Sequence, residues 1–269
     1  MKSALGLCFL VAASLSQAAV PKEQIKLLKD PQGKSLPIVQ KDLVSLERLE
    51  NMFTMHGKTP GLAIMIKRHT LRHKHKAVPL LIKVMKDSKY PEQNRWQATM
   101  LLGRIMGKKS APFIAKFAIH PHWMMRVASL KALLALKQDT YHAVYANALR
   151  DPSLIVRVQA LDNISQMKIN AMAPQVWNMM YDDSNYAGDV GNRKRTSIVK
   201  SIIRTLGDVR FDKARVPMAR LIQKPKYQDL MDDLDYSLEK FTGQTSPNTV
   251  EGRRKFWSKY AMSETKKKI

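Results

Sequence analysis

Residues 142–161 read HAVYANALRDPSLIVRVQAL, and this stretch decides the fold class. Apolar residues recur at three- and four-residue spacing on both sides of Asp151 and Pro152, which is the pattern of amphipathic helices. Aspartate followed by proline is a turn signal, because the carboxylate bonds nearby backbone and proline cannot continue a helix. The stretch therefore predicts two helices joined by a short turn.

The same arrangement recurs along the chain, which predicts a repeat architecture. Segments that resemble the first helix begin at spacings of 33, 31, 31 and 43 residues, at Pro79, Pro112, Ala143, Pro174 and Pro217. Proline is favoured at the first helical position, where its missing N–H has no partner. The segments end at nearly the same spacing, at Asp87, His120, Asp151, Asp182 and Lys224.

Each predicted second helix opens with an arginine. The spacings of these arginines are 31, 31 and 38 residues, and the residues are Arg95, Arg126, Arg157 and Arg195. Small or apolar residues follow three, six and seven positions later, the stripe that a second helix needs to pack on the first. The unit is therefore a helical hairpin of about 31 residues used roughly five times, and the class is all-α.

With Asp151 six residues before Arg157, LRDPSLIVRVQAL resembles the HEAT repeat, in its bacterial form often called PBS-lyase HEAT-like. The resemblance implies an α-solenoid of about five to six hairpins over residues 38–242. It also implies that arginines at the start of second helices pair along a ladder between units. The residues that we assign to this structural ladder are Arg95, Arg126, Arg157, Arg195 and Asp151. His120 replaces the aspartate in one unit, where the ladder is expected to be interrupted.

Residues 243–269 predict a capping helix followed by a basic tail. Asn248 and Glu251 have the spacing of a capping box, and Phe256, Trp257 and Tyr260 lie on one side of the helix that follows. The last unit of an array exposes its apolar face, so we expect these aromatic side chains to cover it.

The N-terminus has the three parts of a secretory signal peptide. Lys2 precedes an apolar run of about a dozen residues, and Ser16-Gln17-Ala18 is a small-residue cleavage site. We expect a signal peptide over 1–18, a linker over 19–37, and a periplasmic or secreted protein with no transmembrane segment. Cleavage would remove Cys8, the single cysteine.

The chain is strongly basic, with 46 Lys and Arg against 22 Asp and Glu. Removing Lys2 with the signal lowers the net charge from +24 to +23. Such a charge favours anionic partners. We expect an acidic protein first and anionic lipid or an envelope polymer second, with nucleic acid less favoured because export removes it from reach. The candidate partner-binding residues are Arg104, Lys131, Lys137, Lys200 and Arg204 on second helices, and Lys67, Arg68 and Arg72 in the basic stretch KRHTLRHKHK, residues 67–76.

Motifs for catalysis, metal or cofactor binding are weak. His69, His73 and His75 could group around a metal, but the neighbouring cations oppose a divalent ion, so we expect a solvated helix end. Asp183, Asn185 and Gly188 resemble the start of a calcium loop, yet Ala187 and Lys194 stand where ligands belong. Two S-x-x-K matches lack companion motifs. We predict no metal, no cofactor and no enzymatic activity.

Together these features predict an exported, non-catalytic HEAT-repeat scaffold that binds an acidic or otherwise anionic partner. The alternative is a basic HEAT-like nucleic-acid-binding or DNA-repair protein, because some glycosylases use this architecture. Fold alone does not choose between the two.

Overall fold

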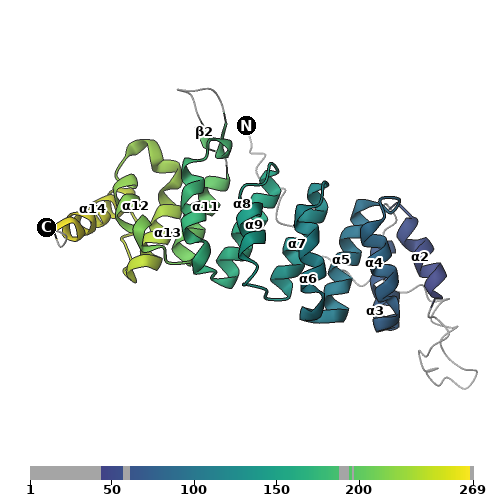
Figure 1. The fold of residues 1–269 in the computed structure, drawn as a ribbon. Helices are drawn as coiled ribbons and strands as arrows, with labels where there is room; N and C mark the ends of the chain where they lie inside the picture. The colour runs from purple at the N-terminus through teal and green to yellow at the C-terminus, as the bar shows by residue number, and fades with distance from the viewer. Residues whose placement is uncertain (1–43, 57–60, 188–193, 196, 267–269) are drawn as a thin grey trace, which may run out of the picture. The chain divides into compact units, whose positions relative to one another are not determined.

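The computed structural model describes residues 44–56, 61–187, 194–195 and 197–266 (Figure 1). The described residues from Leu46 onward form one compact unit. Its α-helices are α2 (Leu46–Thr54), α3 (Leu62–His73), α4 (Val78–Lys86), α5 (Glu92–Met106), α6 (Ala111–Ala115), α7 (Trp123–Ala135), α8 (His142–Leu149), α9 (Leu154–Met167), α10 (Ala173–Asn178), α11 (Ile198–Asp208), α12 (Arg215–Leu221), α13 (Met231–Thr242) and α14 (Val250–Lys266). The described part of the chain is thus helical, as predicted, apart from one short pair of strands.

Short 3-10 turns extend or join many of these helices. They are η1 (Lys74–Ala77), η2 (Gly107–Ser110), η3 (Lys116–Ile119), η4 (Asn170–Met172), η5 (Met179–Tyr181), η6 (Asp183–Asn185), η7 (Asp212–Ala214) and η8 (Pro225–Leu230). Strands β1 (Tyr186–Ala187) and β2 (Lys194–Arg195) are antiparallel and pair Tyr186 with Arg195.

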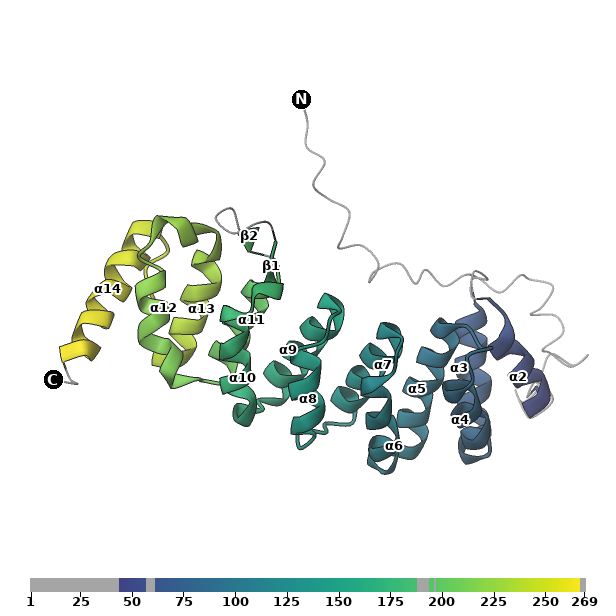
Figure 2. The same ribbon diagram turned by 45° about the horizontal axis from the view of Figure 1, so that its top comes forward.

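The helices alternate between two roles. The first helices are α4, α6, α8, α10 and α12, and each packs on the second helix that follows it: α5, α7, α9, α11 and α13. Helix α3 packs on α5, so it belongs with the second helices. Consecutive second helices also pack on one another from α3 through α13, and they follow in chain order in Figure 2. Short turns make the partners within a pair antiparallel, so all second helices run in the same direction.

Local sequence explains where these helices begin and end. Proline lies in the first turn of α4, α6 and α10, at Pro79, Pro112 and Pro174. A residue with a positive φ follows the end of each second helix. It is glycine after α5 and α13, at Gly107 and Gly243. It is lysine or arginine after the other four, at Lys74, Lys137, Lys168 and Arg210.

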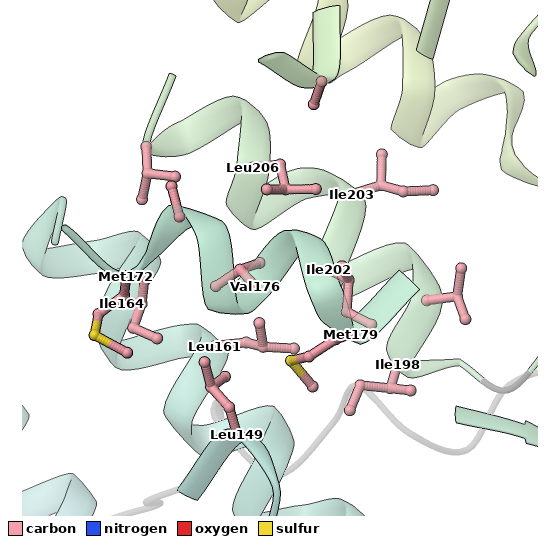
Figure 3. Packing of buried hydrophobic residues seen from close by; sticks show 14 of the residues in the cluster. Leu149, Leu161, Ile164, Met172, Val176, Met179, Ile198, Ile202, Ile203 and Leu206 are labelled. Carbon is pink, nitrogen blue, oxygen red and sulfur yellow. The ribbon is translucent and has the colours of Figure 1, made fainter. Parts of the chain in front are cut away.

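The apolar faces of the pairs form a continuous core. One buried cluster runs from Val127 in α7 to Ala261 in α14. Figure 3 shows its centre, where Leu161 and Ile164 of α9 meet Val176 of α10 and Ile202 of α11. Full burial of a leucine or isoleucine side chain contributes about 1.5–3 kcal/mol, so this repeated packing is the main source of stability.

Two local predictions are wrong. Arg195 does not open a second helix: it lies in β2, which pairs with β1, and α11 begins three residues later at Ile198. The cap of α14 is Thr249 rather than Asn248, since the Thr249 hydroxyl accepts a 3.1 Å hydrogen bond from the N–H of Gly252.

The predicted signal peptide (1–18) and linker (19–37) lie outside the described residues, as does Gly188 of the proposed calcium loop. Within the part of the chain that the structure describes, every helix is too short or too polar to cross a membrane.

Candidate functional site

Four of the five turns between first and second helices share one hydrogen-bonding pattern. In each of the four, a side chain accepts from the backbone N–H two residues later. The carboxylates of Asp87, Asp151 and Asp182 do so at 3.0, 2.8 and 2.9 Å, and the Nδ1 atom of His120 does so at 3.0 Å. At His122 and Ser153 the bonded N–H belongs to the residue just before the second helix, so the bond fixes the backbone where that helix begins.

Arginines connect these turns between neighbouring units. Arg126 donates Nε and Nη2 to the two carboxylate oxygens of Asp151, at 2.6 and 2.7 Å. Arg157 donates to the backbone oxygen of Asp151 at 2.7 Å and to that of Ser184 in the next unit at 3.2 Å. The carboxylate of Asp151 therefore pairs with the arginine of the preceding unit, while its own Arg157 reaches forward.

The arginine contact between turns that involves Arg95, which we call the Arg95–His120 rung, has no carboxylate partner. Arg95 donates twice to the backbone oxygen of Met85, and its Nη2 lies 3.0 Å from Nε2 of His120. Burial and the charge of Arg95 lower the pKa of His120, so the ring is neutral at pH 7. A neutral ring accepts at only one nitrogen, yet both nitrogens of His120 face donors.

These arginines are unsuited to contact a partner. Arg95 and Arg157 are buried, and Arg126 is mostly covered by its partners. The side chain of Arg195 lies outside the described residues.

The candidate partner-binding cations are exposed. Lys67, Arg68 and Arg72 project from α3, while Arg104 and Lys131 project from α5 and α7.

The remaining three candidates differ in their surroundings. Lys200 is exposed on α11. Lys137 lies in the turn after α7 rather than on a helix face. Arg204 pairs with Asp233 of α13 and lies 4.8 Å from the ring centroid of Tyr236. Arg204 is therefore held between two helices and is less free than predicted.

A groove of about 550 Å³ lies where α3, α5 and α7 meet. Its lining residues are Ala63, Lys67, Gln93, Trp96, Gln97, Met100, Leu101, Gly103, Arg104, Ala132, Ala135 and Leu136. We call this the α5 groove. Gln97 donates to the backbone oxygen of Ala63 at 2.6 Å, which fixes α3 beside α5.

The chemistry of the α5 groove suits a ligand with an apolar part and a negative charge. Eight of its twelve lining residues are apolar or glycine, two are amides and two are the cations Lys67 and Arg104. Trp96, Met100 and Arg104 recur every four residues along α5, so they share one face. Tryptophan and arginine are the residues most often found to dominate binding energy at interfaces.

The histidines of the basic stretch differ in their surroundings. His69 is buried, and burial together with Arg72 and Arg68 lowers its pKa. The expectation of a solvated helix end is therefore wrong for His69, although Lys67, Arg68 and Arg72 are exposed. Across the described residues no group of three His, Cys, Asp or Glu side chains could hold a metal ion.

Ser165 and Lys168, which form one S-x-x-K match, both belong to a network of hydrogen bonds. Ser165 donates to Asp208 at 2.6 Å, and Lys168 and Tyr236 donate to the same carboxylate at 3.2 and 2.8 Å. Burial alone would raise the pKa of Asp208, but the bonds from Ser165, Tyr236 and Lys168 hold it below its ordinary value. This cluster joins α9, α11 and α13.

Comparison with known proteins gives no family assignment: no protein-family profile matches the chain, and no curated protein sequence matches it. The likeness to HEAT repeats consequently rests on the spacing of this chain's own residues.

Sequence reasoning missed the α5 groove. Trp96 and Met100 were placed on an apolar-periodic helix, where an aromatic or methionine is normally core. Both are only partly buried. Small residues on the neighbouring helices, such as Ala63 and Ala135, leave the space above them. The alanines are visible in the sequence, but they lie in two separate helices, α3 and α7, and their effect on α5 can be recognised only once the helices are placed side by side.

Proposed function

We propose that this protein is an exported, non-catalytic scaffold of HEAT-like hairpins that binds an acidic protein through the α5 groove. The solenoid assignment is supported by the packing of consecutive second helices and by the arginine contacts between successive turns. The export assignment is supported by the three-part N-terminal sequence.

The observation that carries the binding role is the composition of the α5 groove. It combines a partly exposed apolar lining with two exposed cations, and no carboxylate lines it. A partner segment with a large apolar side chain would cover Trp96 and Met100, and acidic neighbours in that segment would face Lys67 and Arg104. Pairing at the rim then sets orientation and association rate, while apolar burial supplies most of the affinity.

The test is capture of the partner followed by binding measurements with the purified pair. The protein is crosslinked in envelope extract at two salt concentrations, and each captured protein is identified and purified. We expect an acidic protein retained at the higher salt. The double variant Lys67→Glu, Arg104→Glu should weaken its binding by at least tenfold, because two attractions become repulsions.

A matched control carries the same change of charge outside the groove. Lys255→Glu, Lys259→Glu alters two exposed lysines of α14 and should leave the affinity within about twofold. Equal weakening by both double variants would show that only net charge matters and would refute the α5 groove as the site. Tight, salt-resistant binding of duplex DNA in place of any protein would favour the nucleic-acid alternative.

A further inference from the structure

The turns that lead from each second helix to the next first helix carry an excess of positive charge. Their exposed cations are Lys74, Lys76, Lys108, Lys109, Lys137, Lys168, Arg210 and Lys213, and Lys240 lies in the last turn of α13. We call these nine residues the basic edge. Two exposed carboxylates, Asp139 and Asp212, lie in the same turns. Because the second helices run in the same direction, these turns all lie at one edge of the helix rows.

The opposite turns carry little excess charge. Among the residues that the structure describes they contain five acids, Asp87, Asp151, Asp182, Asp183 and Asp229, and six basic residues, Lys89, Arg150, Lys194, Arg195, Lys224 and Lys226. The charge of the chain is therefore distributed unevenly between the two edges.

Backbone preference does not explain the cations of the basic edge. Lys74, Lys137, Lys168 and Arg210 have φ of +51°, +52°, +54° and +50°. Glycine adopts this conformation more easily than any residue with a Cβ, and the chain uses it at the equivalent Gly107. Four of the six second helices are thus followed by a cation with a strained backbone, although glycine would adopt the same conformation without strain.

Helix dipoles do not explain them either. A cation near a helix C-terminus is favourable, which accounts for one basic residue after each second helix. The first helices begin in the same turns, and their N-termini favour anions. Lys76 nevertheless lies two residues before α4, and Lys109 two residues before α6. These two lysines therefore lie near helix N-termini, where the helix dipole disfavours a positive charge.

Three cations of the basic edge surround one hollow. Lys168, Arg210 and Lys240 line a cavity of about 360 Å³ between the ends of α9, α11 and α13, together with Asn170, Gly207 and Asp208. The carboxylate of Asp208 is already bonded by Ser165, Lys168 and Tyr236. The cations outnumber the carboxylate three to one, so the hollow suits a phosphate group.

We propose that the basic edge binds the surface of a membrane that contains anionic phospholipid, with one headgroup phosphate in the hollow between Lys168, Arg210 and Lys240. Large exposed apolar side chains are absent from the described turns of this edge, so the contact is electrostatic and involves no insertion. Exposed aromatic side chains, on which nucleic-acid bases would stack, are absent from the same turns, which disfavours single-stranded nucleic acid.

The test is sedimentation of the full chain with vesicles of phosphatidylcholine alone and with vesicles that also contain phosphatidylglycerol. We expect binding only to the second, and weaker binding as salt rises. In the key variant Lys74, Lys137, Lys168 and Arg210 are all replaced by glycine, which removes four charges and relieves four strained backbones. Each cation near an anionic surface strengthens binding about fivefold, so this variant should bind roughly 500- to 1000-fold more weakly. Lys168→Gly also removes one exposed bond to Asp208, but Ser165 and Tyr236 still bond that carboxylate, so the melting temperature should fall by no more than about 2–4 °C, which separates loss of binding from unfolding.

The control removes four exposed cations from the second helices and leaves the basic edge intact. It is Lys67→Gln, Arg104→Gln, Lys131→Gln, Lys200→Gln, and it should bind anionic vesicles within a fewfold of the wild type. Because it lacks both cations of the α5 groove, it also distinguishes this proposal from the proposed protein partner. Three results would each overturn the proposal. The two quadruple variants could lose vesicle binding equally, or the glycine variant could bind vesicles as strongly as the wild type. The third is wild-type protein that binds duplex DNA but not vesicles.

Discussion

Replacing His120 with aspartate should stabilise the protein. Asp151 shows the geometry that the new carboxylate would adopt, because its turn makes the same bond to the N–H two residues later and also pairs with the preceding arginine. At His120 both ring nitrogens face donors and only one can accept. An aspartate would accept from both the N–H of His122 and the guanidinium of Arg95.

The magnitude follows from one new hydrogen bond and one ring interaction that is removed. A hydrogen bond between charged groups contributes about 1.5–3 kcal/mol. The stacking between the rings of His120 and Phe117, with centroids 6.1 Å apart, is lost and offsets about 0.5–1 kcal/mol. We expect a net stabilisation of about 1–2 kcal/mol, which corresponds to a rise in melting temperature of about 3–6 °C for a chain of this size.

The stabilisation by the aspartate should grow as the solution becomes acidic. The pKa of His120 is lower in the folded protein than in the unfolded chain, so its contribution is complete above pH about 6.5 and is lost as the pH falls. An aspartate paired with Arg95 keeps its contribution down to pH about 4. Urea denaturation above and below pH about 6.5 measures both effects, with Arg95→Met as the second arm of a double-mutant cycle. A variant less stable than the wild type, or a stabilisation that persists without Arg95, would refute the reasoning.

Two further substitutions test the packing between units. Asp151→Asn removes the charge that pairs with the mostly buried Arg126 and should destabilise the protein by about 2–3 kcal/mol in urea denaturation; a change below about 0.5 kcal/mol would show that this rung contributes little. Gly207→Ala would place a Cβ 2.7 Å from the Cα of Ser237, so we expect a loss of about 1–3 kcal/mol and a lower melting temperature. Gly103→Ala is the matched control, since its nearest neighbour would be 3.6 Å away, and it should stabilise α5 by about 0.5–1 kcal/mol. Equal effects of the two alanines would contradict the close approach of α11 and α13.

The helical class was predictable because it depends on local spacing. Proline near the start of first helices and apolar residues three and four apart are properties of single segments, and each segment gives the same answer. The placement of Arg195 was not predictable in this way, because an insertion before it changes the local backbone while leaving the arginine at a similar spacing.

The partners of charged residues were harder to predict than the helices. Asp151 lies six residues before Arg157, but its carboxylate bonds Arg126, which is 25 residues earlier. Arg204 was expected to be free, yet Asp233 and Tyr236 of the adjacent helix hold it. Such pairings depend on which side chains two helices bring together, and this information is not contained in either helix alone.

The Arg95–His120 rung has a consequence for how the protein opens. Arg95 of α5 contacts Met85 of α4 and His120 in the turn before α7, and none of these contacts involves a carboxylate. Because Arg95 lacks the carboxylate partner that Arg126 has in Asp151, fewer charged contacts hold α5 to α7 than hold α7 to α9, so we expect hydrogen exchange to be faster in α4 and α5 than in α9 and α11. The α5 groove spans the junction between α5 and α7, because it is lined by both helices. A ligand bound in the groove would contact both α5 and α7 and would stabilise the junction between them. Its binding would therefore make the two sides of the junction unfold more cooperatively.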